Sequence, residues 1–292
     1  MRGTDWLLLW TLSLLWGGSF LFVELALEAL TPLTIVWARV ALAALILGLA
    51  LRLTGQGMPP RGLWPGLLVM GLLNNAIPFV LIVVAQTAIT GALASVLNAT
   101  TPIFTVIVAH LATRDERLSP AKLAGVGLGF AGVVVMMAAG RLEGAVPAMA
   151  ACLAAALSYG FASVWGRRFR QAGLAPMATA FGQVVASTVL LAPIWLWVDR
   201  PWAMQAPGAV PVMAVLALAV LSTALAYLIY FRILARAGAT AISLVTFLVP
   251  LSAAGLGWLV LGERLEPRHL LGLALILGGL ALIDRARAAR PA

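Results

Sequence analysis

The chain has 292 residues, of which 63% are hydrophobic and 10% are charged, so it has too little polar surface to cover a water-soluble particle of this length. This composition predicts an integral membrane protein and argues against a soluble catalytic domain or a nucleic-acid-binding domain. The net charge of +9 is instead expected to follow the positive-inside rule, because most of the 19 Lys and Arg residues fall on the side of the N-terminus. Both termini are therefore predicted to be cytoplasmic.

Ten apolar segments have about the length that crosses a bilayer as a helix, roughly 20 residues. We predict ten transmembrane helices, over residues 5–27, 32–53, 63–85, 91–112, 120–140, 146–168, 176–198, 209–232, 239–261 and 267–284. The connections between them are short and are marked by proline or glycine, which indicates turns between helices and not domain linkers. No connection is long enough to fold as a soluble domain.

One short motif occurs twice in the chain. Residues 116–120, Glu-Arg-Leu-Ser-Pro, recur as residues 263–267, Glu-Arg-Leu-Glu-Pro, and each copy precedes a span with glycine at matching places. The chain is therefore predicted to be a duplication, with one five-helix repeat over 1–143 and a second over 144–292. Because each half holds an odd number of spans, the second must enter the membrane inverted. Transporters of this build bind substrate at the repeat interface near the bilayer midplane.

Polar side chains at midspan indicate which helices face a cavity, because such groups are costly in lipid without a partner or water. They lie in the first, third, fourth, sixth, eighth and ninth spans, so these six are predicted to line a central cavity, with the fifth and tenth at the periphery. The second and seventh spans are intermediate. The predicted substrate-binding residues are Trp16, Phe20, Asn75, Phe79, Asn98, Thr101, Tyr159, Ser163, Tyr227 and Thr246. For any one of them, the alternative is a hydrogen bond to a neighbouring helix.

Proline and small residues inside spans predict where helices bend or pack closely. Pro78, Pro102 and Pro250 each remove a backbone hydrogen bond, which predicts either a static kink or a hinge for alternating access. The small residues Ala121, Gly125 and Gly129 of the fifth span favour close helix packing, with a dimer face as the alternative. Both a monomer and a homodimer remain open.

Two charged residues, Glu24 and Arg39, lie within spans toward the predicted outer side. We expect them to pair across the first two helices. The alternatives are that Glu24 carries a coupling proton and that either residue contacts a charged substrate as it leaves. No fixed charge is expected at midspan, so the cavity is predicted not to select strongly for the charge of a substrate side chain. With so few buried titratable groups, uniport-like transport is favoured over proton coupling.

Several kinds of chemistry lack their sequence signals. The only lysine, Lys122, is not part of a phosphate-binding loop, and Cys152 has no partner for a disulfide. No clustered His, Asp or Glu set suggests a metal or an acid-base pair. We therefore expect no cofactor, no metal and no enzymatic activity, which disfavours an intramembrane transferase. A purely structural membrane protein is also disfavoured, because six helices would then carry midspan polarity without a use.

Two inverted five-helix halves, each with Glu-Arg-Leu-x-Pro before a glycine-bearing last helix, resemble the EamA branch of the drug/metabolite transporter superfamily. Within that branch the sequence Trp16-Gly17-Gly18-Ser19-Phe20 and the midspan aromatic residues resemble YddG-type amino-acid exporters of bacterial inner membranes. The resemblance implies export of amino acids and related metabolites by alternating access. The alternative within the superfamily is efflux of drugs or quaternary amines. Small multidrug relatives use a buried glutamate of the first helix, but Glu24 lies nearer the outer end than that position.

Overall fold

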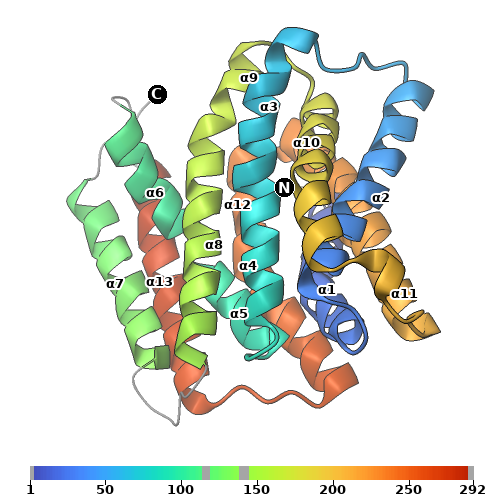
Figure 1. The fold of residues 1–292 in the computed structure, drawn as a ribbon. Helices are drawn as coiled ribbons and strands as arrows, with labels where there is room; N and C mark the ends of the chain where they lie inside the picture. Colours follow the sequence, from blue (N-terminus) through green and yellow to red (C-terminus); the bar gives the residue numbers. More distant parts are fainter. Residues whose placement is uncertain (1–2, 114–118, 138–144, 289–292) are drawn as a thin grey trace.

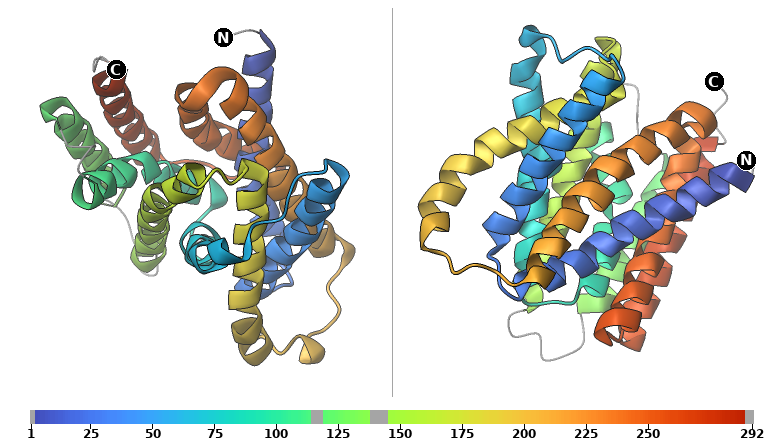
Figure 2. Two further views of the ribbon diagram at one scale, coloured as in Figure 1. Left: turned by 90° about the horizontal axis from the view of Figure 1, so that it is seen from above. Right: turned by 90° about the vertical axis from the view of Figure 1, so that its right-hand side faces the viewer.

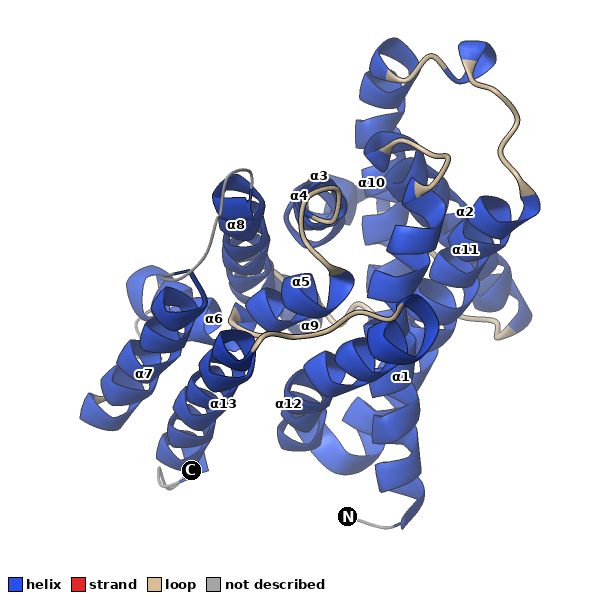
Figure 3. Cartoon of the chain, turned by 90° about the horizontal axis from the view of Figure 1, so that it is seen from below, coloured by secondary structure: helices blue, strands red, loops and turns tan. Residues whose placement is uncertain are grey.

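The computed structural model describes residues 3–113, 119–137 and 145–288, and within these ranges the chain forms helices and turns but no strand (Figures 1 and 3). Seven helical stretches are long and apolar enough to cross a membrane, and three shorter apolar helices accompany them over Pro120–Val135, Leu248–Leu261 and Pro267–Ile283. Many large apolar side chains, such as Leu45 and Trp197, lie exposed on the outside of the bundle. The prediction of an all-helical integral membrane protein is confirmed.

Short connections join the helices. In chain order they are α1 Gly3–Leu27, α2 Pro32–Leu53, η1 Arg61–Leu63, α3 Trp64–Gly71, η2 Leu72–Ala76, α4 Ile77–Ala85, α5 Gly91–Asn98, α6 Thr101–Ala112, α7 Pro120–Met137, α8 Ala145–Trp165, α9 Arg167–Gln171, α10 Pro176–Val198, η3 Pro201–Ala203, α11 Ala209–Ala219, η4 Val220–Leu225, α12 Ala226–Leu261 and α13 Pro267–Ala288. Local signals set several starts. For α2, the hydroxyl of Thr31 accepts a hydrogen bond from the Thr34 backbone N–H, and Pro32 takes the first helical position.

Two of the predicted spans are interrupted by a turn of π-helix. The segment η2, Leu72–Ala76, separates α3 from α4, and η4, Val220–Leu225, separates α11 from α12. The two interruptions occupy matching places in the two halves of the chain, and both contain polar residues. A π-helical turn adds a residue to the helical repeat and often marks a functional site. The spans predicted over 63–85 and 209–232 agree with the apolar helical stretches Arg61–Ala85 and Ala209–Ile233, each of which contains a π-helical turn.

Helix α12, Ala226–Leu261, does not run straight but turns back on itself. Tyr230 packs on Trp16 of α1 with ring centroids 5.8 Å apart, while the Ser252 hydroxyl hydrogen bonds that of Ser13, one turn away on α1. On a straight helix Tyr230 and Ser252 would lie about 33 Å apart. Both parts of α12 therefore lie against the same stretch of α1 (Figure 2). The two spans predicted over 209–232 and 239–261 are adjacent in space, without the separating loop that the sequence suggested.

Glycines bring the backbones of α7 and α13 into direct contact, and these helices lie side by side at one edge of the bundle (Figure 1). A Cβ atom added to Gly125 would lie 2.6 Å from the carbonyl oxygen of Gly279, and one added to Gly132 would lie 2.6 Å from that of Gly272. Gly125 and Gly272 are counterparts in the two halves, as are Gly132 and Gly279, so the contact is reciprocal. Gly129 packs on Ile103. The packing role predicted for this small-residue face is therefore confirmed.

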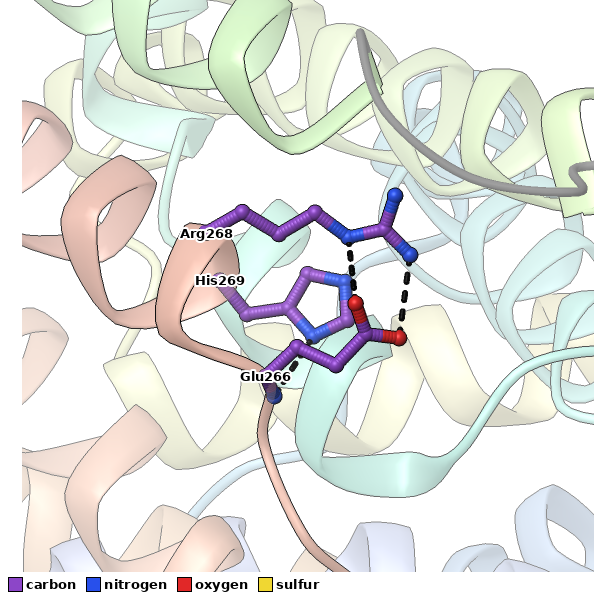
Figure 4. Close-up of polar contacts among 3 residues, drawn as sticks. All are labelled: Glu266, Arg268 and His269. Carbon is purple, nitrogen blue, oxygen red and sulfur yellow. Dashed lines mark hydrogen bonds and ion pairs between the residues drawn. The ribbon is translucent and has the colours of Figure 1, made fainter.

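The second copy of the repeated motif fixes the start of α13. The backbone N–H of Glu266 donates to Nδ1 of His269 at 3.3 Å, and Arg268 forms a two-pronged ion pair with the Glu266 carboxylate at 2.8 and 3.0 Å (Figure 4). A side chain three positions into a helix that accepts from the capping residue is half of a capping box. The residues Glu116, Arg117 and Leu118 of the first copy lie outside the described residues.

Candidate transport cavity

A cavity of about 760 Å³ lies between the helices, a size that suits a small-molecule ligand. Nine of the ten predicted substrate-binding residues line it, namely Trp16, Phe20, Phe79, Asn98, Thr101, Tyr159, Ser163, Tyr227 and Thr246. Among the residues that the structure describes, none that lines the cavity comes from α7 or α13, in agreement with their predicted peripheral position. The predicted set of six helices is incomplete, because α2 contributes Arg39 and α10 contributes Thr179 and Gln183.

Asn75 is the exception among the predicted binding residues. It is completely buried and does not line the cavity, whereas its neighbour Asn74 does. On a regular helix Asn75 shares one face with Gly71 and Pro78. Met70 and Asn74 face the cavity one helical turn apart, whereas Gly71, Asn75 and Pro78 do not line it, so Asn75 lies on the neighbouring face of the helix. The next lining residue after Asn74 is Phe79, five positions on, which is the offset that a π-helical turn introduces.

Hydrogen bonds link three helices around the cavity wall. The Asn74 amide donates through Nδ2 to Oε1 of Gln183 at 3.0 Å, and Nε2 of Gln183 donates to the Tyr227 hydroxyl at 3.0 Å. These two hydrogen bonds join η2, α10 and α12, and they fix the orientation of the Tyr227 ring beside the cavity. Gln183 lies in the seventh predicted span, which the polar pattern does not assign to the cavity. Its role depends on the hydrogen bond from Asn74, a residue that lies 109 positions earlier in the chain.

Aromatic rings form much of the remaining wall. Trp16 and Tyr230 lie with centroids 5.8 Å apart and rings tilted by 40°, while Tyr227 stacks on Phe231 at 6.2 Å. All four residues border the cavity, as does Tyr159 on α8. Such surfaces bind apolar and aromatic groups by contact area and bind cations through the ring faces. The wall therefore combines apolar surface with a few fixed hydrogen-bonding groups.

Arg39 places a positive charge on the wall of the cavity, for which the sequence predicts no fixed charge. Its Nε donates to Oγ1 of Thr223 at 2.9 Å, and its guanidinium carbon lies 3.9 Å from the centroid of the Phe79 ring. The expected pair with Glu24 is wrong. Thr223 follows Arg39 by 184 residues and reaches it only because η4 of the second half packs beside α2.

Glu24 lies behind one end of the cavity and does not line it. Its carboxylate accepts a short hydrogen bond from the backbone N–H of Gly91 at the start of α5, and Glu263 accepts from Ala92 at 3.2 Å. Negative groups are favourable at a helix N-terminus. Beside them the Gln86 amide donates to the Phe20 carbonyl oxygen at 2.9 Å. These contacts close the cavity at this end, which is lined by buried side chains.

The opposite end of the cavity reaches the surface between α8 and α10. Here the lining includes Arg170, Gly173 and Pro176, all of which are exposed. Among the described residues that line the cavity, the charged ones are Arg39 and Arg170, and both are positive. A molecule would enter past Arg170 and meet the aromatic wall before the closed end.

The three predicted hinge prolines occupy different settings. Pro78 and Pro102 take first-turn positions, in α4 just after η2 and in α6 just after the break that follows Asn98. A first-turn proline loses no helical hydrogen bond, so Pro102 marks where a new helix begins. Pro78 differs, because helical backbone precedes it without a break, and its missing N–H falls beside the π-helical turn. Pro250 lies inside α12 and lines the cavity. Movement at any of them stays a prediction.

Comparisons with known proteins agree on one family. The model of the EamA-like transporter family matches the chain twice, over residues 5–138 and 146–284. The uncharacterized inner membrane transporter YedA of Escherichia coli K12 is 25% identical over 286 residues, which are 97% of this chain and 92% of YedA. Protein PecM of Dickeya dadantii is 25% identical over 276 residues, which are 92% and 88% of the two chains. A solved crystal structure covers 99% of this chain and 100% of its own at 22% identity and a TM-score of 0.69, which shows the shared fold.

Proposed function

Because the chain belongs to the EamA-like transporter family, we propose that it exports amino acids of broad specificity, aromatic ones included, and related metabolites. Transport would proceed by alternating access across a bacterial inner membrane, and the protein would act as a transporter and not as an enzyme. The resemblance of residues 16–20 to YddG-type exporters supports this substrate class. The proposal concerns substrate and direction, since membership of a transporter family leaves both open.

The observation that carries the proposal is the cavity itself. It is enclosed by helices from both halves of the chain, and it combines aromatic rings with hydrogen-bonding groups that are mostly uncharged. An amino acid needs polar partners for its two charged groups and a tolerant apolar surface for its side chain. A volume of about 760 Å³ exceeds what a single aromatic amino acid fills, which is compatible with broad specificity.

We further propose that ten transmembrane helices form two inverted repeats, over 1–143 and 144–292, with both termini in the cytoplasm. Three findings support this arrangement: the two successive family matches, the reciprocal glycine contact between α7 and α13, and the π-helical turns at matching places. With this orientation, the open end of the cavity between α8 and α10 faces the cytoplasm. The described conformation would then be the one that loads substrate for export.

Efflux of drugs or quaternary amines, coupled to protons through Glu24, is the second candidate. The aromatic walls favour it, because ring faces attract cations. Two observations weigh against it. The charged side chains that line the described cavity are both arginines, and Glu24 contacts the backbone of Gly91 outside the cavity surface. A uniport-like mechanism needs no titratable group in the cavity, and we favour it for this reason.

Counterflow in proteoliposomes tests the proposed function. Vesicles preloaded with unlabelled phenylalanine are expected to accumulate labelled phenylalanine, tryptophan and leucine, without an imposed pH gradient. Glu24→Gln is expected to retain this exchange if the protein folds. Counterflow seen only with quaternary amines would instead favour the second candidate, and an absolute requirement for a pH gradient that Glu24→Gln abolishes would contradict uniport.

A further inference from the structure

Arg39 is a buried charge whose partners in the described part of the chain are all neutral. The residue is 8% exposed, and its contacts there are the hydrogen bond from Nε to Thr223 and the face of the Phe79 ring. A guanidinium keeps its proton throughout the physiological range, so this side chain cannot escape the cost of burial by becoming neutral. An uncompensated charge within a membrane protein is expensive and marks a functional site by default.

The two contacts of Arg39 leave one side of the guanidinium available. Thr223 occupies Nε and Phe79 covers one face, while the two terminal nitrogens have no hydrogen-bond partner among the described residues. Arg39 borders the cavity, so a molecule inside can approach these nitrogens. Two terminal N–H groups side by side match the two oxygens of a carboxylate, which they bind through parallel hydrogen bonds.

The surrounding wall suits the remainder of such a molecule. Tyr159 and Tyr227 border the same cavity as Arg39, and Trp16 and Tyr230 extend the aromatic surface from α1 and α12. No acidic side chain lines the described cavity, so the protein provides no ion-pair partner for an amine there. The fixed charges of the cavity therefore discriminate against cations and in favour of anions and zwitterions.

We propose that Arg39 binds the carboxylate of the transported molecule, and that the cavity takes carboxylate-bearing amphiphiles in preference to amines of the same shape. The inference rests on the proposed function of this cavity as the substrate site. It does not require the substrate to carry an amino group. The carboxylate would lie against Arg39 with the apolar body on the aromatic wall.

A panel of four compounds with one aromatic body tests the proposal on the unmodified protein. L-phenylalanine carries both charged groups, 3-phenylpropionate only the carboxylate, phenethylamine only the amine, and 3-phenylpropanamide neither. Calorimetric titration of the purified full chain is expected to show that both carboxylates bind at least about tenfold more tightly than the amine and the amide, as loss of charge-assisted hydrogen bonds implies.

The outcomes separate the two proposals. Binding of 3-phenylpropionate without binding of L-phenylalanine would contradict amino-acid export and leave the role of Arg39 standing. Equal or tighter binding of phenethylamine, or no binding of either carboxylate, would overturn the role of Arg39. If 3-phenylpropionate binds and L-phenylalanine does not, the proteoliposome assay should also show no amino-acid counterflow. That assay measures the failure of amino-acid export independently of binding.

Variants then separate recognition from structural support. Arg39→Gln is expected to reduce the preference for 3-phenylpropionate over phenethylamine to less than about threefold, and Arg39→Lys is expected to restore part of it. Thr223→Val removes the Nε partner but leaves the charge, so the preference should persist. The matched control is Arg52→Gln, which removes the exposed arginine of the same helix.

A purely structural Arg39 would give a different pattern. Arg39→Gln would then lower the melting temperature while changing the affinities for all four compounds by the same factor, and this result would overturn the proposal. If Arg39→Gln does not fold, the proposal is still tested by the carboxylate preference of Arg39→Lys and by the binding of the four compounds to the unmodified protein. An Arg39→Lys protein that loses the carboxylate preference entirely, while Arg52→Gln keeps it, would restrict the role to the fork geometry of arginine and still support recognition.

Discussion

Gln183 shows how one side chain holds the wall of the cavity in place. Its amide accepts from Asn74 and donates to Tyr227, so three helices depend on a residue that is almost fully buried. A buried polar group that loses its partner keeps the full cost of its lost hydration. Arg39 is the same kind of case with a charge, and both residues come from helices that the polar pattern left as intermediate.

Replacing Gln183 by leucine is expected to destabilise the protein by about 1–3 kcal/mol, because the Asn74 amide and the Tyr227 hydroxyl both lose a partner. Thermal unfolding of the purified protein in detergent measures the effect as a lower melting temperature. Gln171→Leu, the same change at an exposed position of α9, is the control and should leave the melting temperature almost unchanged. Equal effects of the two changes would contradict a stabilising role for the linked amides.

At the scale of helices, the two halves of the chain are joined by backbone contact and not only by side-chain packing. Apolar side chains gain little from leaving lipid for protein, so helix association in a membrane depends on close approach and on hydrogen bonds. Gly125 and Gly279 provide that approach between α7 and α13, and Gly17 provides it where α1 meets Ser252 of α12. At these glycines even one added methyl group would clash with the neighbouring backbone, so the helices could accommodate it only by moving apart.

Gly125→Ala places a Cβ atom 2.6 Å from the Gly279 carbonyl oxygen, so the two helices must separate. We expect a loss of stability of about 1–3 kcal/mol from disturbed packing, outweighing the gain of about 1 kcal/mol from replacing glycine in a helix. The same substitution at Gly127, which has open space around it, should be neutral or stabilising. Denaturation of both variants in mild detergent measures the difference, and a stabilised Gly125→Ala protein would show that α7 and α13 do not pack as described.

At the scale of the whole molecule, the cavity is asymmetric. Its open end lies between α8 and α10, and its other end is closed by contacts that include Gln86 with Phe20 and Glu263 with the start of α5. The closing contacts bring the repeated motif of the second half onto helices of the first. Alternating access would require this end to open while the α8–α10 end closes.

Cysteine labelling in a Cys152→Ala background tests the sidedness of the cavity, because the native thiol is buried. Ser163→Cys lines the cavity, and Thr87→Cys lies on the exposed turn at the closed end. With cytoplasmic termini, a membrane-impermeant maleimide should label Ser163→Cys mainly in inside-out vesicles and Thr87→Cys mainly in right-side-out vesicles. The reverse pattern would invert the proposed topology, and equal labelling of Ser163→Cys from both sides would contradict a one-sided opening.

Most of the cavity could be read from the sequence, because midspan polarity in lipid has few uses other than facing water, a ligand or another helix. Nine of the ten predicted wall residues, such as Tyr159 and Thr246, line the observed cavity. Asn75 does not line it, because the face of this helix that carries Met70 and Asn74 is the one turned to the cavity, and polarity alone does not distinguish two adjacent asparagines. The apposition of Glu263 and Glu24 around the start of α5 was likewise out of reach, since it joins residues from opposite halves.

By itself, the sequence determined that this is a helical membrane protein with a polar interior and a repeated motif, because composition, periodicity and repetition are properties of the chain. Only the tertiary structure decided where Arg39 points. A guanidinium on a long, flexible stem reaches several directions from one backbone position, and Thr223 and Phe79 fix one of them. The single positive charge in the depth of the cavity, and with it the proposed preference for carboxylates, therefore depends on packing between elements far apart along the chain.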